Sequence, residues 1–149
     1  MTKTPALTME LRRLMEETMR RSMKGMLAFA RDRNISFSQI AILMHLHYQE
    51  KSTVSDIAEK LGTTSAAASQ LIKKLEQDHL IRRHEGTDDR RIRQIELGRD
   101  GRKLVNALIE TRFRWVDDFS LSFDAEKADR ILLSIQELTE MFKRHDANL

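Results

Sequence analysis

The spacing of apolar residues predicts long helices at both ends of the chain. From Leu7 to Ala30, leucine, methionine and alanine recur at intervals of three and four, the period of one helix face. Similar stripes run from Leu104 to Phe119 and from Ala128 to Phe142, with a break at LSFDAEK between them. A single copy of the chain would leave part of such stripes exposed. We therefore expect residues 5–32 and 105–146 to form the dimerisation helices of a homodimer.

Shorter helices with recognisable caps are predicted in the middle of the chain. Ser36 and Gln39 fit the Ser-x-x-Gln capping box, in which each side chain accepts a hydrogen bond from the other residue's backbone N–H. That helix should run to about Tyr48. Thr53 can cap a second helix, and its apolar positions are Val54, Ile57, Ala58 and Leu61. Gly62 is placed to end it in the left-handed conformation.

A third short helix is predicted after the glycine, and after that helix the pattern of apolar residues changes from helical to strand-like. Thr64 or Ser65 can cap it, it should reach about Asp78, and its buried face is Ala68, Leu71, Ile72 and Leu75. Two short helices joined by a tight turn are typical of a helix-turn-helix. The next residues read as two strands, with a loop at residues 85–90 and a returning strand at 92–97.

These elements predict a mostly α fold: a winged helix-turn-helix with a two-stranded β wing and long N- and C-terminal dimerisation helices. The DNA-binding lobe would span residues 36–98 of a single domain at 1–149.

The third helix has an unusually small exposed face. A helix enters the DNA major groove only if its leading side chains are short enough to reach the base edges. Here Gln70 can pair with adenine, serine and threonine hydroxyls can bond bases or phosphates, and alanine methyls can pack on thymine methyls. Close packing by another helix is the alternative explanation. The predicted DNA-binding residues of this segment are Thr64, Ser65, Ala66, Ala67, Ser69, Gln70, Lys73 and Lys74.

Charge favours the DNA interpretation. The net charge is only +3, but residues 60–103 hold 11 Lys and Arg against 7 Asp and Glu, a local excess of +4. The predicted wing loop carries Arg90 and Arg91 beside Asp88 and Asp89, with Arg93 following. An arginine at a hairpin tip fits the narrow minor groove of A·T-rich DNA, and a neighbouring aspartate can orient it. On an isolated hairpin, such a turn would simply be solvated.

From about Ile35 to Leu104 the chain resembles the MarR family of winged-helix regulators. The stretches that carry the resemblance are ISFSQIAIL, TVSDIAEKLGTTSAAASQLIKKLEQDHLIRR, DDRR and IELGRDGRKL. The resemblance implies an obligate homodimer, a recognition helix in the major groove and a wing arginine in the minor groove. It assigns the signature aspartate to Asp89 and the minor-groove arginine to Arg91, with Arg90 beside it. The chain departs from the family pattern at His79, usually Gly, at Gly98, usually Thr or Ser, and at Arg93, often apolar.

The same resemblance implies a small aromatic or anionic effector near the junction of the long helices and the DNA-binding lobe. Methionine and aromatic side chains adapt to apolar ligands, and His45 or Arg112 could meet a carboxylate. Ordinary core and interface packing is the alternative explanation for these residues. The candidate effector residues are Met15, Met19, Met23, Phe29, His45, Arg112, Phe113 and Trp115.

Several other classes of function have no support in the sequence. The chain has no cysteine, so thiol chemistry and cysteine-bound metals are excluded. His45 and His47 are two residues apart, so on a helix they point about 200° apart and cannot share an ion. We expect no metal, no cofactor, no enzymatic activity, no membrane span and a cytoplasmic location. The predicted function is a sequence-specific double-stranded DNA-binding transcriptional regulator, a repressor released by a small-molecule ligand, whose dimer binds an inverted-repeat operator. A winged-helix protein adaptor is the alternative.

Overall fold

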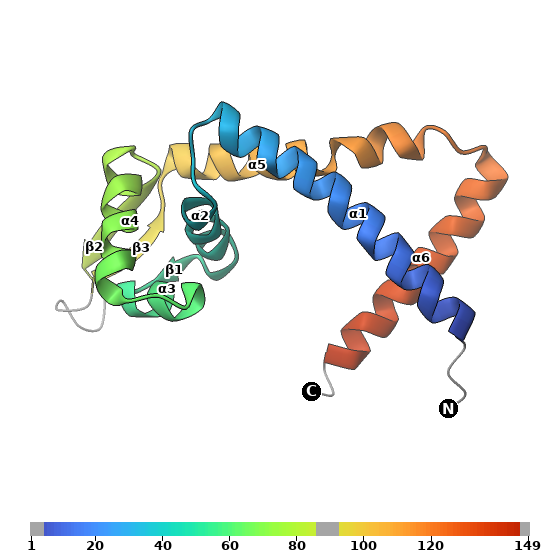
Figure 1. Cartoon of the computed structure of the whole chain (residues 1–149), viewed down its shortest axis with the longest axis horizontal. Coiled ribbons are helices and arrows are strands. Elements are labelled where there is room, and N and C mark those ends of the chain that lie inside the picture. The colour runs from blue at the N-terminus through green and yellow to red at the C-terminus, as the bar shows by residue number, and fades with distance from the viewer. Residues whose placement is uncertain (1–4, 86–92, 147–149) are drawn as a thin grey trace. The chain divides into compact units, whose positions relative to one another are not determined.

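The computed structural model describes residues 5–85 and 93–146 of the 149-residue chain. The chain divides into two compact units, Met1–Phe113 and Arg114–Leu149, and each is described by itself. In chain order the helices and strands are α1 (Pro5–Asp32), α2 (Phe37–Gln49), β1 (Lys51–Ser52), α3 (Val54–Leu61), α4 (Ser65–Gln77), β2 (Ile81–Glu85), β3 (Arg93–Leu97), α5 (Arg99–Ser120) and α6 (Ala125–Asp146). This order confirms the mostly α winged helix-turn-helix fold (Figure 1).

The helix starts are those that the sequence predicts. The Ser36 backbone N–H donates to Gln39 Oε1 at 3.0 Å, and the Gln39 N–H donates to Ser36 Oγ at 3.2 Å. At α3, the Thr53 N–H donates to Asp56 Oδ2 at 2.8 Å, and the Asp56 N–H donates to Thr53 Oγ1 at 3.2 Å. These bonds lower the pKa of the Asp56 carboxyl, the backbone bond from Thr53 most of all. Gly62 ends α3 in the left-handed region, with φ of 60°.

The turn after α4 shows why two departures from the family pattern are tolerated. His79 has φ of 57°, the left-handed conformation that usually selects glycine. The backbone N–H of Leu80 closes this turn on the carbonyl of Leu75 at 2.9 Å. Gly98 precedes α5, and its carbonyl accepts the first helical bond from Arg102 at 3.0 Å. A side chain at Gly98 would come within 2.9 Å of the His79 carbonyl oxygen.

The sheet has one strand more than the sequence predicts. β2 and β3 form the predicted antiparallel hairpin, but β1 adds to the other edge of β3, giving the order β1-β3-β2. β1 is only two residues long, and it pairs Lys51 with Glu96 and Ser52 with Ile95. A strand of two residues is too short to show the alternation of apolar and polar residues from which strands are predicted. The predicted two-stranded wing is therefore the hairpin part of a three-stranded sheet.

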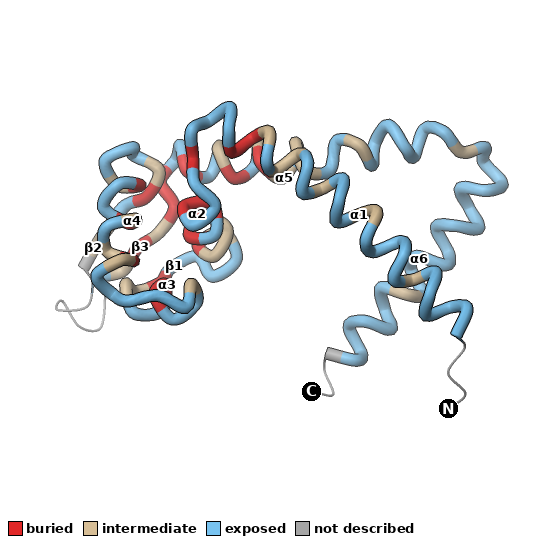
Figure 2. Tube along the Cα trace, in the orientation of Figure 1, coloured by how far each residue is buried: buried red, intermediate tan, exposed pale blue. Residues whose placement is uncertain are grey.

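One hydrophobic core holds the sheet and the helices of the winged-helix lobe together. Its buried side chains come from α1 to α5 and from both hairpin strands, and Figure 2 shows them gathered around α2, α4 and β3. The predicted buried face of α4 is confirmed, with Ala68, Ile72 and Leu75 fully buried and Leu71 partly so. This packing fixes which face of α4 is left for a partner.

The long helices carry large apolar side chains that the lobe does not cover. On α1 these include Leu14, Met15 and Met19, which are 57%, 58% and 64% exposed. Within the second unit, no residue of α6 from Ala125 to His145 is buried, although the helix is amphipathic. Across the described ranges, no helix is long and apolar enough to cross a membrane.

Candidate nucleic-acid interface

Helix α4 presents the small residues on the face opposite the core. Thr64 caps it, with its Oγ1 accepting from the Ala67 N–H at 3.2 Å. Ala68, Ile72 and Leu75 anchor the other side of the helix. The predicted residues are all exposed or half-buried: Thr64, Ser65, Ala66, Ala67, Ser69, Gln70, Lys73 and Lys74. The structure thus brings the eight together on one helix, with the Thr64 hydroxyl used for the cap.

Two lysines are the charged side chains on this face of α4. Lys73 and Lys74 are exposed, and Glu76 on the wing side of the helix forms an ion pair with Arg83, with Arg83 Nε 3.1 Å from Glu76 Oε2. The carboxylate is therefore offset by an arginine of β2. A slim polar face with exposed lysines can accept a groove edge and its phosphates, because phosphate contacts position a helix while short side chains reach the bases.

The wing is described along its stem. Arg82 of β2 and Glu96 of β3 face each other, and their side chains form an ion pair of 3.1 Å on the outer face of the hairpin. The predicted minor-groove residues Asp89, Arg90 and Arg91 lie outside the described residues, as does the rest of segment 86–92. Their roles remain predictions from the sequence.

Residues that the sequence analysis did not select lie on both flanks of α4. On the wing side, a cleft of about 320 Å³ is lined by Glu76, Arg83, His84 and Arg93. On the other side, a cleft of about 380 Å³ is lined in part by Arg33, together with Lys74, which the sequence analysis had selected. The sequence held one signal for the first cleft, because Arg93 stands where an apolar residue is usual.

The candidate effector residues come from helices α1, α2 and α5. Met15, Met19 and Met23 are exposed along α1, whereas Phe29 is buried in the core at 6% exposure. His45 lies on α2, and its Nε2 is 2.8 Å from Ser52 Oγ of β1. Trp115 belongs to the second unit, where its ring centroid is 6.3 Å from that of Phe119. These observations leave the effector assignment a prediction.

Arg112 and Phe113 lie where α5 crosses α1. Arg112 Nε donates to Ser22 Oγ at 3.0 Å, and the guanidinium carbon lies 5.5 Å from the Phe113 ring centroid. The helices meet closely because α1 has Gly25 there: a Cβ on this residue would lie 2.8 Å from the Thr111 carbonyl oxygen. At this crossing the Arg112 guanidinium therefore lies close to the exposed ring of Phe113.

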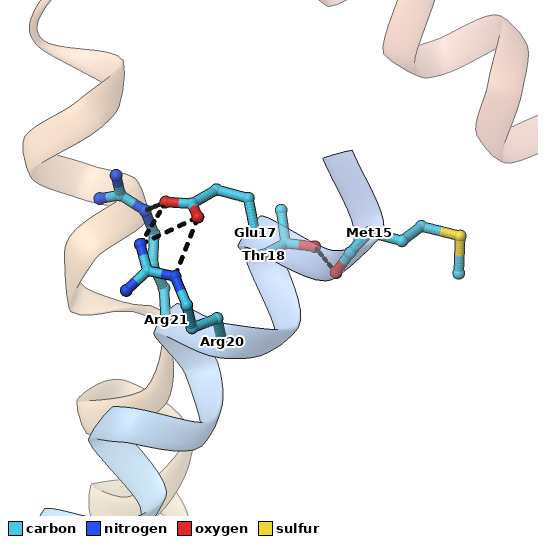
Figure 3. A network of polar contacts seen from close by, with 5 residues as sticks. All are labelled: Met15, Glu17, Thr18, Arg20 and Arg21. Carbon is cyan, nitrogen blue, oxygen red and sulfur yellow. Dashed lines mark hydrogen bonds and ion pairs between the residues drawn. The ribbon is translucent and has the colours of Figure 1, made fainter. Parts of the chain in front are cut away.

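The polar side of α1 carries charges that are paired with one another. The Glu17 carboxylate accepts from Arg20 Nη2 and from Arg21 Nε, both at 2.7 Å (Figure 3). These hydrogen bonds, the one from Arg20 first, lower the pKa of Glu17. Thr18 Oγ1 donates to the Met15 carbonyl in the same turns. These polar contacts stabilise the exposed surface of α1. The methionine side chains take no part in them.

Comparison with known proteins identifies the lobe. The family model described as "MarR family" matches residues 35–92. The HTH-type transcriptional regulator SarZ of Staphylococcus aureus is 26% identical over 95 residues, which are 63% of this chain and 64% of SarZ. The chain thus spans just under two thirds of the length of that curated relative.

Two solved structures share the fold. The transcriptional regulator Tm0710 from Thermotoga maritima superposes with a TM-score of 0.85 and 22% identity, covering 93% of this chain and 98% of Tm0710. MepR of S. aureus, in a crystal structure of its DNA complex, gives a TM-score of 0.59 and 24% identity, covering 88% of this chain and 96% of MepR. At these identities the likeness establishes the fold.

Proposed function

We propose that the chain is a sequence-specific double-stranded DNA-binding transcriptional regulator of the MarR family, whose model matches residues 35–92. The observation that carries the proposal is the exposed face of α4: small side chains, one glutamine and two lysines on a helix whose opposite face is locked into the core. SarZ is a transcriptional regulator, and MepR has been crystallised with DNA. A regulator of this kind is not an enzyme, and it acts in the cytoplasm, where its DNA lies.

The test of this proposal is the binding of fluorescent duplex DNA at several salt concentrations. A DNA-binding winged helix should bind random duplex weakly, with affinity that falls linearly on a logarithmic salt scale, because each neutralised phosphate releases counterions. A protein adaptor would show no such binding. Random duplex is a sufficient probe for this first distinction, because the electrostatic contribution does not depend on sequence.

We further propose a homodimer formed through residues 5–32 and 105–146. The support is the uncovered apolar surface of each unit, on α1 in the first and on α6 in the second. Sedimentation equilibrium at micromolar concentration should give about twice the chain mass of 17.4 kDa. A single species at the monomer mass would contradict the dimer and, with it, the inverted-repeat operator.

The finer part of the proposal is repression relieved by a small aromatic or anionic effector. Its support in the structure is the α1–α5 crossing, where the Arg112 guanidinium lies over Phe113 and beside Ser22. Such a ligand must bind the DNA-free form more tightly, since equal affinity for both forms shifts nothing. Salicylate at millimolar concentration should lower DNA affinity at fixed salt. The Arg112→Ala variant should lose that response while it retains DNA binding.

A further inference from the structure

The stem of the wing carries arginines on the face that is turned toward the core. In the β2–β3 ladder, Arg83 lies opposite Ile95, and Glu85 lies opposite Arg93. Opposed residues of an antiparallel pair share a face of the sheet, and so do residues two apart on one strand. Because Ile95 is fully buried in the core, Arg83 and Arg93 belong to that inner face, with Arg93 farther out along the hairpin.

The inner face of the stem borders a cleft of about 320 Å³, here called the wing-stem cleft, lined by Glu76, Arg83, His84 and Arg93. The ion pair between Glu76 and Arg83 holds α4 to β2 at one wall. Arg93 is exposed, and the ladder places it opposite Glu85. Of the two arginines in this lining, Arg83 is already paired with Glu76, and Arg93 is the one that lies farther out along the hairpin.

The wing-stem cleft lies beside the predicted DNA-facing surface. β2 runs back alongside α4 after the turn at His79 (Figure 1). On α4, Glu76 follows Lys73 by three residues, so the two side chains are separated by only about 60° around the helix. The exposed Lys73 thus marks where the groove-facing side of α4 meets the flank that carries the cleft.

We propose that the wing-stem cleft binds a phosphate of the DNA backbone, with Arg93 as the contacting residue. A helix in the major groove has a phosphate backbone along each flank, and the strand on the wing side would pass this cleft. An arginine fork matches phosphate geometry through two parallel N–H···O bonds. The contact positions the helix and reads no base. The inference rests on the proposed function, and it adds a binding residue on the stem to those expected at the wing tip.

A matched pair of variants tests the inference. Arg93→Ala removes the inner-face cation, and Arg82→Ala removes an equal charge from the outer face, where Arg82 pairs with Glu96. Affinity for duplex DNA is measured over a series of salt concentrations. We expect Arg93→Ala to reduce the slope of log K against log salt by about 0.9 for each bound protomer, roughly a fivefold loss per contact at 0.15 M salt. The loss should be similar on specific and random duplexes, and Arg82→Ala should keep the wild-type slope.

The outcomes separate the inference from the function on which it rests. Wild-type protein with no salt-dependent duplex binding would contradict the proposed function. If the wild type binds normally and Arg93→Ala keeps the wild-type slope, the inference is overturned but the proposed function is not. The same holds if Arg82→Ala reduces the slope as much as Arg93→Ala, because the effect would then be one of long-range charge. Arg93→Lys, which keeps the cation, should retain most of the slope. If thermal denaturation shows that Arg93→Ala has lost stability, Arg93→Gln takes its place in the same comparison.

Discussion

Gly101→Ala provides a sharp test of how the wing is joined to α5. Gly101 is buried in the first turn of α5, and a Cβ there would overlap the backbone carbonyl oxygen of Leu80, just before β2. It would also lie 2.9 Å from the Leu80 carbonyl carbon and 3.3 Å from Leu97 Cδ2. A backbone carbonyl cannot rotate away as a side chain can, so α5 or the start of the wing must shift.

Two effects of opposite sign compete in this variant. Alanine is favoured over glycine within a helix by up to about 1 kcal/mol. Overpacking of a tight site costs about 1–3 kcal/mol, and here the contacted atoms belong to the backbone. Because the clash is with backbone, we expect the upper end of that cost, and after the helix gain is subtracted Gly101→Ala should lower the free energy of unfolding by about 2 kcal/mol.

Urea denaturation measures this prediction, with all variants at one protein concentration because dimerisation makes stability depend on concentration. Asn106→Ala is the matched control, since Asn106 is exposed on the same helix and its replacement should change stability by only a few tenths of a kcal/mol, in the favourable direction. If Gly101→Ala is as stable as Asn106→Ala, the close contact between α5 and the wing is wrong.

Three other variants test the recognition helix, the wing and a helix cap. Gln70→Ala should cost about 1–3 kcal/mol on the specific site and little on random duplex, and an equal loss on both would show that Gln70 reads no base. Arg91→Ala should weaken binding, less so when flanking A·T pairs become G·C, because a wider minor groove attracts arginine less; wild-type affinity on every flank would refute the assignment. Asp56 has a lowered pKa in the folded state, so its contribution to stability is present above about pH 4 and is lost as pH falls through the folded pKa. Asp56→Asn should therefore be less stable than wild type at pH 7, and the difference should shrink at pH 3 in thermal denaturation.

Local features of the fold were predictable from the sequence because their causes are local. The capping box at Ser36 and Gln39 involves residues three apart, and the left-handed end at Gly62 depends on one residue's backbone freedom. Strand β1 was not predictable, because its pairing of Lys51 with Glu96 joins segments far apart in the chain. A strand of two residues is too short for its pairing with β3 to be recognised from the sequence.

The candidate site divides in the same way. The DNA-facing surface of α4 follows from helical periodicity once the buried residues are recognised, so it could be predicted. The wing-stem cleft depends on the register that puts Arg93 on the inner face of the hairpin and on a helix–strand ion pair, Glu76 with Arg83. The sequence showed only that Arg93 was out of place. For the effector residues, burial of Phe29 and the bond between His45 and Ser52 could not be foreseen from spacing.

The central claim is that a two-fold dimer reads an inverted repeat through two α4 helices. Selection of bound duplexes from a random pool, followed by footprinting of the enriched sequence, tests it most directly. A two-fold dimer with its recognition helices in successive major grooves should select two half-sites in inverted orientation, with centres about 10 base pairs apart. Both half-sites should be protected together at every protein concentration that gives protection. Enrichment of one isolated half-site, or of no sequence at all, would contradict the account.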